Sequence, residues 1–174
     1  MRLSPFPLLL ACSLSIASGA ALAADPAPEI QRPAGAPQSV GAVHTLRAIP
    51  EACARLEGAF SGEAAQPYRY AAVRTSPQCQ PRARFVDYAK AQPSLAKGWK
   101  LNDVIRVPSA ACPSQQAVVR VWRLPADNKP VLDGQGSARV YLKDAKENAV
   151  AGKKLPPLTM YAADMQLEGK ACGG

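Results

Sequence analysis

Apolar and polar residues alternate along much of the chain after residue 40, and a period of two predicts half-buried β-strands. The segments 68–75, 82–88 and 99–107 show this alternation. The expected inward face of 99–107 carries Trp99, Leu101, Asp103, Ile105 and Val107. One side of these strands is therefore expected to pack in a core and the other to meet water.

Segment 116–124 is apolar on both faces, which is typical of a central strand that is covered on both sides. Further strands are expected at 139–143 and 158–167, and a first strand is expected around His44. The loop 125–136 is rich in Pro, Gly, Asn and Asp, so it is expected to be a long turn-rich connection.

Residues 50–60 fit either a helix or a strand. Gly58 would lie near the middle of the helical version and would weaken it, so a strand is favoured. This strand could turn back along 68–75 as a hairpin in which residue 60 faces residue 68.

One short helix is expected near 145–151. Asp144 and Glu147 have the spacing of a capping box, and Gly152 follows as a stop signal. With the strands above, the pattern predicts a mainly β fold: a disulfide-linked sandwich, or a partly open barrel, of about seven or eight strands.

The first 23 residues have the features of a signal peptide. Arg2 supplies a positive charge, residues 8–22 are apolar or small, and Ala21-Leu22-Ala23 resembles a cleavage site. The alternative is a lipoprotein anchored through Cys12, but almost no apolar run would precede that cysteine. The sequence favours export to the periplasm or the exterior.

The rest of the chain divides into a tail and one domain. Residues 24–38 are rich in Pro and Ala and predict an extended, flexible tail. Residues 39–174 have the length of a single domain. No later segment approaches the roughly 20 apolar residues that a membrane helix needs, so an integral membrane protein is not expected.

Removing the signal peptide leaves four of the five cysteines, which can pair in three ways. No C-x-x-C motif or close Cys/His pair is present, so two structural disulfides are expected. The hairpin would bring Cys53 close to Cys79, and the second bond would then join Cys112 to Cys172.

Motifs for catalysis, metals and cofactors are absent: there is no nucleophile elbow, P-loop, dinucleotide fingerprint or zinc-protease helix. The sequence therefore predicts no catalytic residues, metal or cofactor, and favours a non-enzymatic protein. His44 is the single histidine, and Asp103 is a carboxylate on an otherwise apolar face. Such a carboxylate must be paired, hydrogen-bonded or placed at a strand bulge.

Charge is the feature that points to a partner. The chain has 21 Lys and Arg against 13 Asp and Glu, a formal charge of +8. Several basic residues fall at expected outward positions, namely Arg82, Arg84, Lys100, Arg106, Arg139 and Lys143. We expect an extracytoplasmic binding module whose basic face engages an anionic partner, such as an envelope component or an acidic protein. Nucleic acid stays among the candidates.

Two other functions are compatible with the same sequence. A secreted inhibitor or immunity-type protein could act on an enzyme through the loop 125–136. A small secreted hydrolase could use His44 or Asp103.

Overall fold

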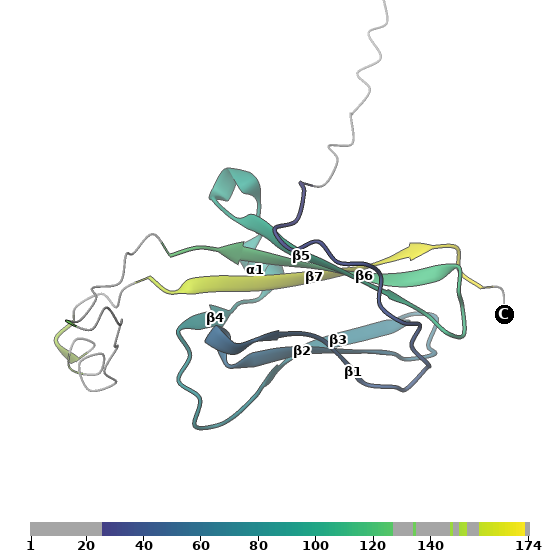
Figure 1. Ribbon diagram of the computed structural model, residues 1–174, viewed down its shortest axis with the longest axis horizontal. Helices are drawn as coiled ribbons and strands as arrows, with labels where there is room; N and C mark the ends of the chain where they lie inside the picture. Colours follow the sequence, from purple (N-terminus) through teal and green to yellow (C-terminus); the bar gives the residue numbers. More distant parts are fainter. Residues whose placement is uncertain (1–25, 127–133, 135–146, 148–149, 153–156, 173–174) are drawn as a thin grey trace, which may run out of the picture.

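The structure is a computed structural model that describes residues 26–126, 134, 147, 150–152 and 157–172. In these residues the chain forms two β-sheets that face each other (Figure 1). The three-stranded sheet has the order β1 (His44–Ile49), β2 (Ala54–Phe60), β3 (Tyr68–Arg74). The four-stranded sheet has the order β4 (Ala83–Phe85), β7 (Thr159–Gly169), β6 (Gln115–Leu124), β5 (Lys100–Pro108). The short helical turns are η1 (Pro50–Ala52), α1 (Tyr88–Ala91) and η2 (Leu95–Lys97).

The expectation of a mainly β sandwich is confirmed, and the sheets do not close into a barrel. All neighbouring strands are antiparallel except β4 and β7, which are parallel. β6 lies between β7 and β5, the central position that its two apolar faces predicted. No helix in the described part of the chain is long and apolar enough to cross a membrane.

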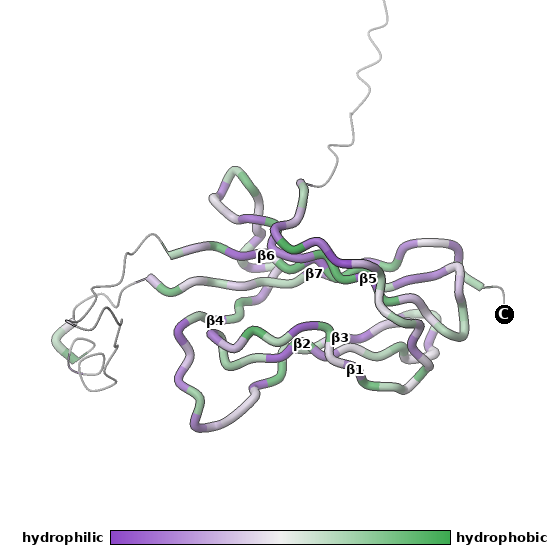
Figure 2. Tube along the Cα trace, in the orientation of Figure 1, coloured by the Kyte–Doolittle hydropathy of each residue, from purple (hydrophilic) through white to green (hydrophobic). Residues whose placement is uncertain are grey.

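The core lies between the two sheets. Leu56, Phe60 and Tyr68 from the three-stranded sheet pack with Val119 and Val121 from the other layer. Figure 2 shows apolar positions recurring along the strands of both layers, with polar positions between them. Full burial of a side chain such as Leu or Phe contributes about 1.5–3 kcal/mol, so this interface is the main source of stability.

A hydrogen bond also links the layers at one end of the core. The Tyr161 hydroxyl of β7 donates to Glu51 Oε1 of η1 at 2.5 Å. Burial, together with this hydrogen bond, raises the pKa of Tyr161 to about 12. The same bond lowers the pKa of Glu51, so Glu51 is a charged acceptor at neutral pH.

Residues 50–60 resolve into a helical turn followed by a strand. Pro50 begins η1, and β2 starts at Ala54, so the strand interpretation is confirmed for 54–60. The hairpin has the expected register, with Phe60 opposite Tyr68. Their rings pack edge to face, with centroids 4.8 Å apart.

The segment 82–88 is shorter as a strand than its alternation indicated. β4 ends at Phe85, and α1 begins at Tyr88. Asp87 explains the change, because its carboxylate accepts the Lys90 backbone N–H at 3.1 Å and caps the helix. The expectation of a strand to Tyr88 is therefore wrong beyond Phe85.

The predicted strand 139–143 lies outside the described residues. The predicted helix at 145–151 also lies mostly outside them. Within the described part, the Ala151 N–H donates to the Glu147 carbonyl at 2.9 Å, which is one helical turn.

A β-bulge in β5 moves residues that the alternation placed on a single face. Leu101 lies opposite Trp122, and Asp103 lies opposite Val121, so Asn102 is an extra residue. The prediction that Leu101 and Asp103 share a face is wrong, because one inserted residue reverses a strand's inward and outward positions.

The bulge divides the apolar residues of 99–107 between two clusters. Ile105 and Val107 belong to the core between the sheets. Trp99 and Leu101 instead pack with Trp122 in a second cluster on the other face of the four-stranded sheet, joined by side chains of the 86–91 segment. That cluster is what holds α1 against the sheet.

Both disulfides expected from the sequence are present. Cys53 is bonded to Cys79, and Cys112 is bonded to Cys172. The first bond joins the start of β2 to the loop after β3. The second joins the β5–β6 loop to the chain beyond β7.

The N-terminal segment 26–38, for which the sequence predicted a flexible tail, is held along β5. N–H groups of this segment donate to β5 carbonyls: Glu29 to Leu101, Ile30 to Asn102, Gly35 to Arg106 and Gln38 to Pro108. In Figure 1 the purple segment follows the four-stranded sheet. The outer edge of β5 is therefore covered by the chain itself, which residue composition did not predict.

Ion pairs reinforce this docked segment. Arg123 donates to Glu29 at 2.6 Å, and Lys100 lies 3.9 Å from the same carboxylate. Arg32 donates to the buried Asp103 carboxylate at 2.6 Å. Asp103 also accepts from Arg47 of β1 at 3.3 Å, so one carboxylate joins the N-terminal segment and both sheets.

We expect the N-terminal segment to loosen in acid. The hydrogen bond from Arg123 holds the pKa of Glu29 below its ordinary value of 4.5. A depressed pKa stabilises the folded state at neutral pH, and the stabilisation is lost as the pH falls through the folded-state pKa. Amide exchange measured by NMR should show Ile30 and Gly35 losing protection below about pH 4.5, ahead of the central Val119.

The matched variant Glu29→Gln should show weaker protection of Ile30 and Gly35 at neutral pH and a smaller pH dependence. Unchanged protection of these amides in the variant would contradict the role of Glu29.

Candidate interaction surfaces

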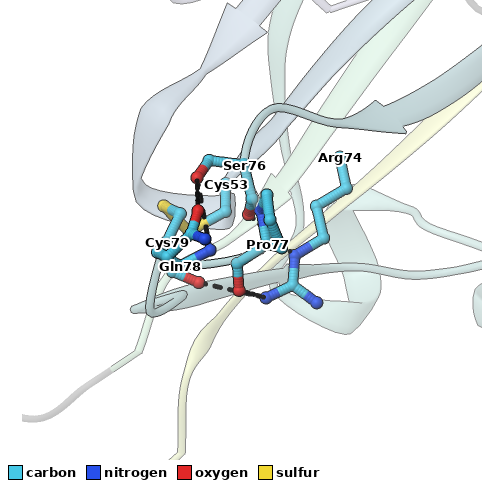
Figure 3. Close-up of a disulfide and its surroundings, with 6 residues drawn as sticks. All are labelled: Cys53, Arg74, Ser76, Pro77, Gln78 and Cys79. Carbon is cyan, nitrogen blue, oxygen red and sulfur yellow. Dashed lines mark hydrogen bonds between the residues drawn. A yellow bond between two sulfur atoms is a disulfide. The ribbon is translucent and has the colours of Figure 1, made fainter.

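The end of β3 is tied to the loop that follows it. Arg74 donates to the carbonyl oxygens of Ser76 at 3.0 Å, Pro77 at 3.0 Å and Cys79 at 3.2 Å (Figure 3). The Cys53–Cys79 disulfide holds the same loop from the other side. The guanidinium of Arg74 is thus occupied in fixing local structure.

An open hollow of about 750 Å³ lies beside β3, between the two layers. Its walls come from β3, from the segment that joins β4 to α1, and from β7 at Ala163 and Asp164. We call it the interlayer hollow. Its polar side chains are Tyr70, Arg74, Asp87, Tyr88 and Asp164.

Tyr70 bridges the walls of the interlayer hollow. Its hydroxyl donates to the Ala163 carbonyl at 2.9 Å, from β3 to β7. Burial is the main reason that the pKa of Tyr70 is raised, and the negative charges of Asp164 and Asp87 add to it. The phenol therefore stays a protonated donor at neutral pH, and both carboxylates act on the same part of the hollow.

Carboxylates and aromatic rings together suit a cationic group. In the described residues no group of three or more His, Cys, Asp or Glu side chains is placed to hold a metal ion. The carboxylates and aromatic rings of this lining therefore have the chemistry to accept a positively charged side chain.

A second hollow of about 550 Å³ borders the other end of β3. Tyr68, Arg69 and Ala71 line it from β3, and Met165 lines it from β7. Arg69 forms an exposed salt bridge with Glu63 at 2.7 Å. β3 is thus flanked by hollows along its length.

His44 and Asp103, the two candidates for catalysis, are both engaged in the fold. His44 Nε2 lies 2.8 Å from the Tyr68 hydroxyl, and its Nδ1 lies 3.1 Å from the Ala42 carbonyl oxygen. Asp103 has no exposed surface and is held by Arg32 and Arg47. The structure gives both residues clear structural partners.

The basic residues singled out from the sequence are distributed over the molecule. Arg84 lies on β4 and Arg106 on β5, which are opposite edges of the four-stranded sheet with two strands between them. At about 4.8 Å per strand, those edges are roughly 14 Å apart. Lys100 is paired with Glu29, and Arg82 is exposed in the chain just before β4. Arg139 and Lys143 lie outside the described residues.

A different set of cations gathers around α1. Arg84 Nη2 lies 3.2 Å from Met160 Sδ, and Met160 packs in the cluster beneath α1. Lys90 is exposed in α1, and Lys97 donates to the Gln92 carbonyl at the end of this helix at 3.1 Å. We call Arg84, Lys90 and Lys97 the α1 basic patch.

Alternation did not identify Lys90 and Lys97, because both residues lie between the alternating segments 82–88 and 99–107. The charge balance of 82–97 contained the signal, with four basic residues and one acidic residue. The loop 125–136, considered for an inhibitor, lies largely outside the described residues.

Comparison with known proteins finds no matching family model, no matching curated protein and no matching solved structure. The fold defines the class of protein: a mainly β, two-layer domain with two disulfides. Disulfides are typical of proteins from an oxidising, extracytoplasmic environment.

Proposed function

We propose that the protein is a non-enzymatic binding module, exported to the periplasm or secreted, whose α1 basic patch engages an anionic polymer of the cell envelope. The observation that carries this proposal is the exposure of Arg84, Lys90 and Lys97 without a salt bridge to any described residue. Unpaired exposed cations raise the local potential and attract anionic partners.

Many other cations in the described chain are occupied. Arg55 pairs with Glu57 at 2.5 Å, and Arg123 pairs with Glu29. Arg32 and Arg47 share the buried Asp103. The α1 basic patch therefore supports binding better than net charge alone, because its charges are not neutralised within the fold.

The patch also has a firm support. Tyr88 and Ala91 of α1 pack on a cluster that contains Trp99 and Trp122. Asp87 caps α1 and is the one acidic residue between residues 82 and 97. Point charges on a fixed surface suit repeated acidic groups of a polymer, which need no deep pocket.

The proposal is tested by neutralising the patch and a matched set of paired cations. The patch variant is Arg84→Gln/Lys90→Gln/Lys97→Gln, and the control is Arg55→Gln/Arg69→Gln/Lys100→Gln, which removes the same charge. On an alginate column, the patch variant should elute at clearly lower salt than the control. Melting temperatures of both should stay close to that of the unmodified protein, because exposed charges contribute about 0–1 kcal/mol each.

Equal elution of the two variants would show that retention follows net charge, and the α1 basic patch would lose its assignment. Retention on polyglutamate but not on alginate would replace the envelope polymer with an acidic protein as the partner.

A further inference from the structure

β3 is an exposed strand edge, unlike the other edges of the two sheets. The outer edge of β5 is covered by the N-terminal segment, β4 has three residues, and β1 contains an irregularity between Thr45 and Arg47. β3 pairs with β2 over seven consecutive residues without a shift. Covered, short or irregular edges are the usual protection against pairing with another chain, so β3 is the edge open to strand addition.

The pairing pattern shows which backbone groups of β3 face outward. The Thr75 N–H donates to the Cys53 carbonyl, and the Ser61 N–H donates to the Pro67 carbonyl. In an antiparallel pair, alternate residues are hydrogen-bonded to the neighbour, so 69, 71 and 73 face β2. The N–H and C=O groups of Tyr70 and Ala72 therefore face away from β2, and they have no backbone partner among the described residues.

Small side chains leave this part of the edge accessible. Ala71 and Ala72 are exposed, and Val73 is 36% exposed. A strand added here would extend the three-stranded sheet, and alternate side chains of that strand would point toward the opposite layer. The interlayer hollow, lined by β3 and by Asp87 and Asp164, lies on that side.

We propose that the β3 edge binds an extended segment of a partner polypeptide by strand addition, and that a lysine or arginine of this segment enters the interlayer hollow. Main-chain hydrogen bonds would supply affinity and the hollow would supply specificity. Charge complementarity selects the basic side chain, since Asp87 and Asp164 both act on Tyr70 while Arg74 is held by three carbonyls of its own loop.

This site is separate from the α1 basic patch and shares no residue with it. The proposed function and the strand-addition site can therefore fail independently: one is measured with an anionic polymer, the other with a cationic peptide.

The test uses the full chain and synthetic ten-residue peptides of alternating threonine and valine. One peptide has a central arginine, a second has norleucine there, and a third is the arginine peptide with N-methyl groups on alternate backbone nitrogens. The arginine peptide should bind with NMR shifts at the Tyr70 and Ala72 amides. Its Kd should be at least tenfold lower than that of either other peptide.

Two protein variants locate the interaction. Asp87→Asn/Asp164→Asn keeps a side chain that can cap α1. This variant should bind the arginine peptide at least tenfold more weakly, and its affinity for the norleucine peptide should be unchanged. Ala72→Pro removes an outward N–H that β2 does not use, so it should abolish peptide binding. Glu63→Gln is the control: it changes an exposed carboxylate outside the interlayer hollow and should leave peptide binding unchanged.

Undiminished binding by the N-methylated peptide would overturn strand addition. Equal binding of the arginine and norleucine peptides would overturn the role of the interlayer hollow. If sedimentation shows that the unmodified protein is a dimer and that Ala72→Pro is not, a second copy of the chain occupies the β3 edge. That result would overturn the assignment of this edge to a partner peptide. If Ala72→Pro does not fold, the N-methylated peptide and the amide shifts decide the matter.

Discussion

Replacing Asp103 with alanine is expected to lower the free energy of unfolding by about 3–5 kcal/mol. The Asp103 side chain has no exposed surface, and the Arg47 side chain is 14% exposed. Without the carboxylate, Arg47 would keep its charge in a largely buried position and lose its ion-pair partner. Removing one member of a buried ion pair costs this much because the other charge is left uncompensated. Urea unfolding followed by tryptophan fluorescence measures the loss.

The exposed pair of Arg69 and Glu63 provides the comparison. Both side chains are more than half exposed, so Glu63→Ala should cost at most about 1 kcal/mol. Arg32→Ala should cost less than Asp103→Ala, because Arg47 still neutralises the carboxylate. Similar losses for Asp103→Ala and Glu63→Ala would contradict the central role of Asp103.

Replacing Cys112 and Cys172 with serine is expected to destabilise the protein more than replacing Cys53 and Cys79. The two bonds span 60 and 26 residues respectively. Loop-closure entropy then predicts losses of about 4.3 and 3.5 kcal/mol. The longer loop also contains all of β6 and β7, which are the central strands of the four-stranded sheet.

Urea unfolding of the two double variants under non-reducing conditions measures this order. Ser114→Ala is a suitable control near Cys112, because it removes a hydroxyl that donates to the Lys170 carbonyl but leaves the disulfide intact. A smaller loss for the Cys112 and Cys172 variant than for the other pair would mean that strain or residual structure, rather than loop length, sets the stability.

The candidate surfaces were predictable only in part. Arg84 was identified from its outward position, and Lys90 and Lys97 could have been found from the charge of 82–97. The three residues of the α1 basic patch come together only because of the position of α1. This helix packs on a cluster of side chains from β5, β6, β7 and the segment between β4 and β5. The interlayer hollow depends on contacts between layers, so no local pattern indicated it.

The sequence by itself determined the features that arise from neighbouring residues. The β2–β3 hairpin and its register follow from alternation and a short connection. That hairpin brings Cys53 near Cys79, and an even number of cysteines leaves the second pair. Two apolar faces were enough to place β6 inside a sheet.

Only the tertiary structure decided which strands become edges and what covers them. β4 pairs in parallel with β7, although the paired residues Ala83 and Thr159 are far apart in the sequence. The 26–38 segment lies along β5, where its backbone is hydrogen-bonded and where Glu29 and Arg32 form ion pairs. Alternation reports that a strand has a buried side, but it carries no information on the neighbour along the sheet. The bulge at Asn102 likewise depends on pairing with β6. The one extra residue allows β5 to contribute side chains to the core and also to bury Asp103.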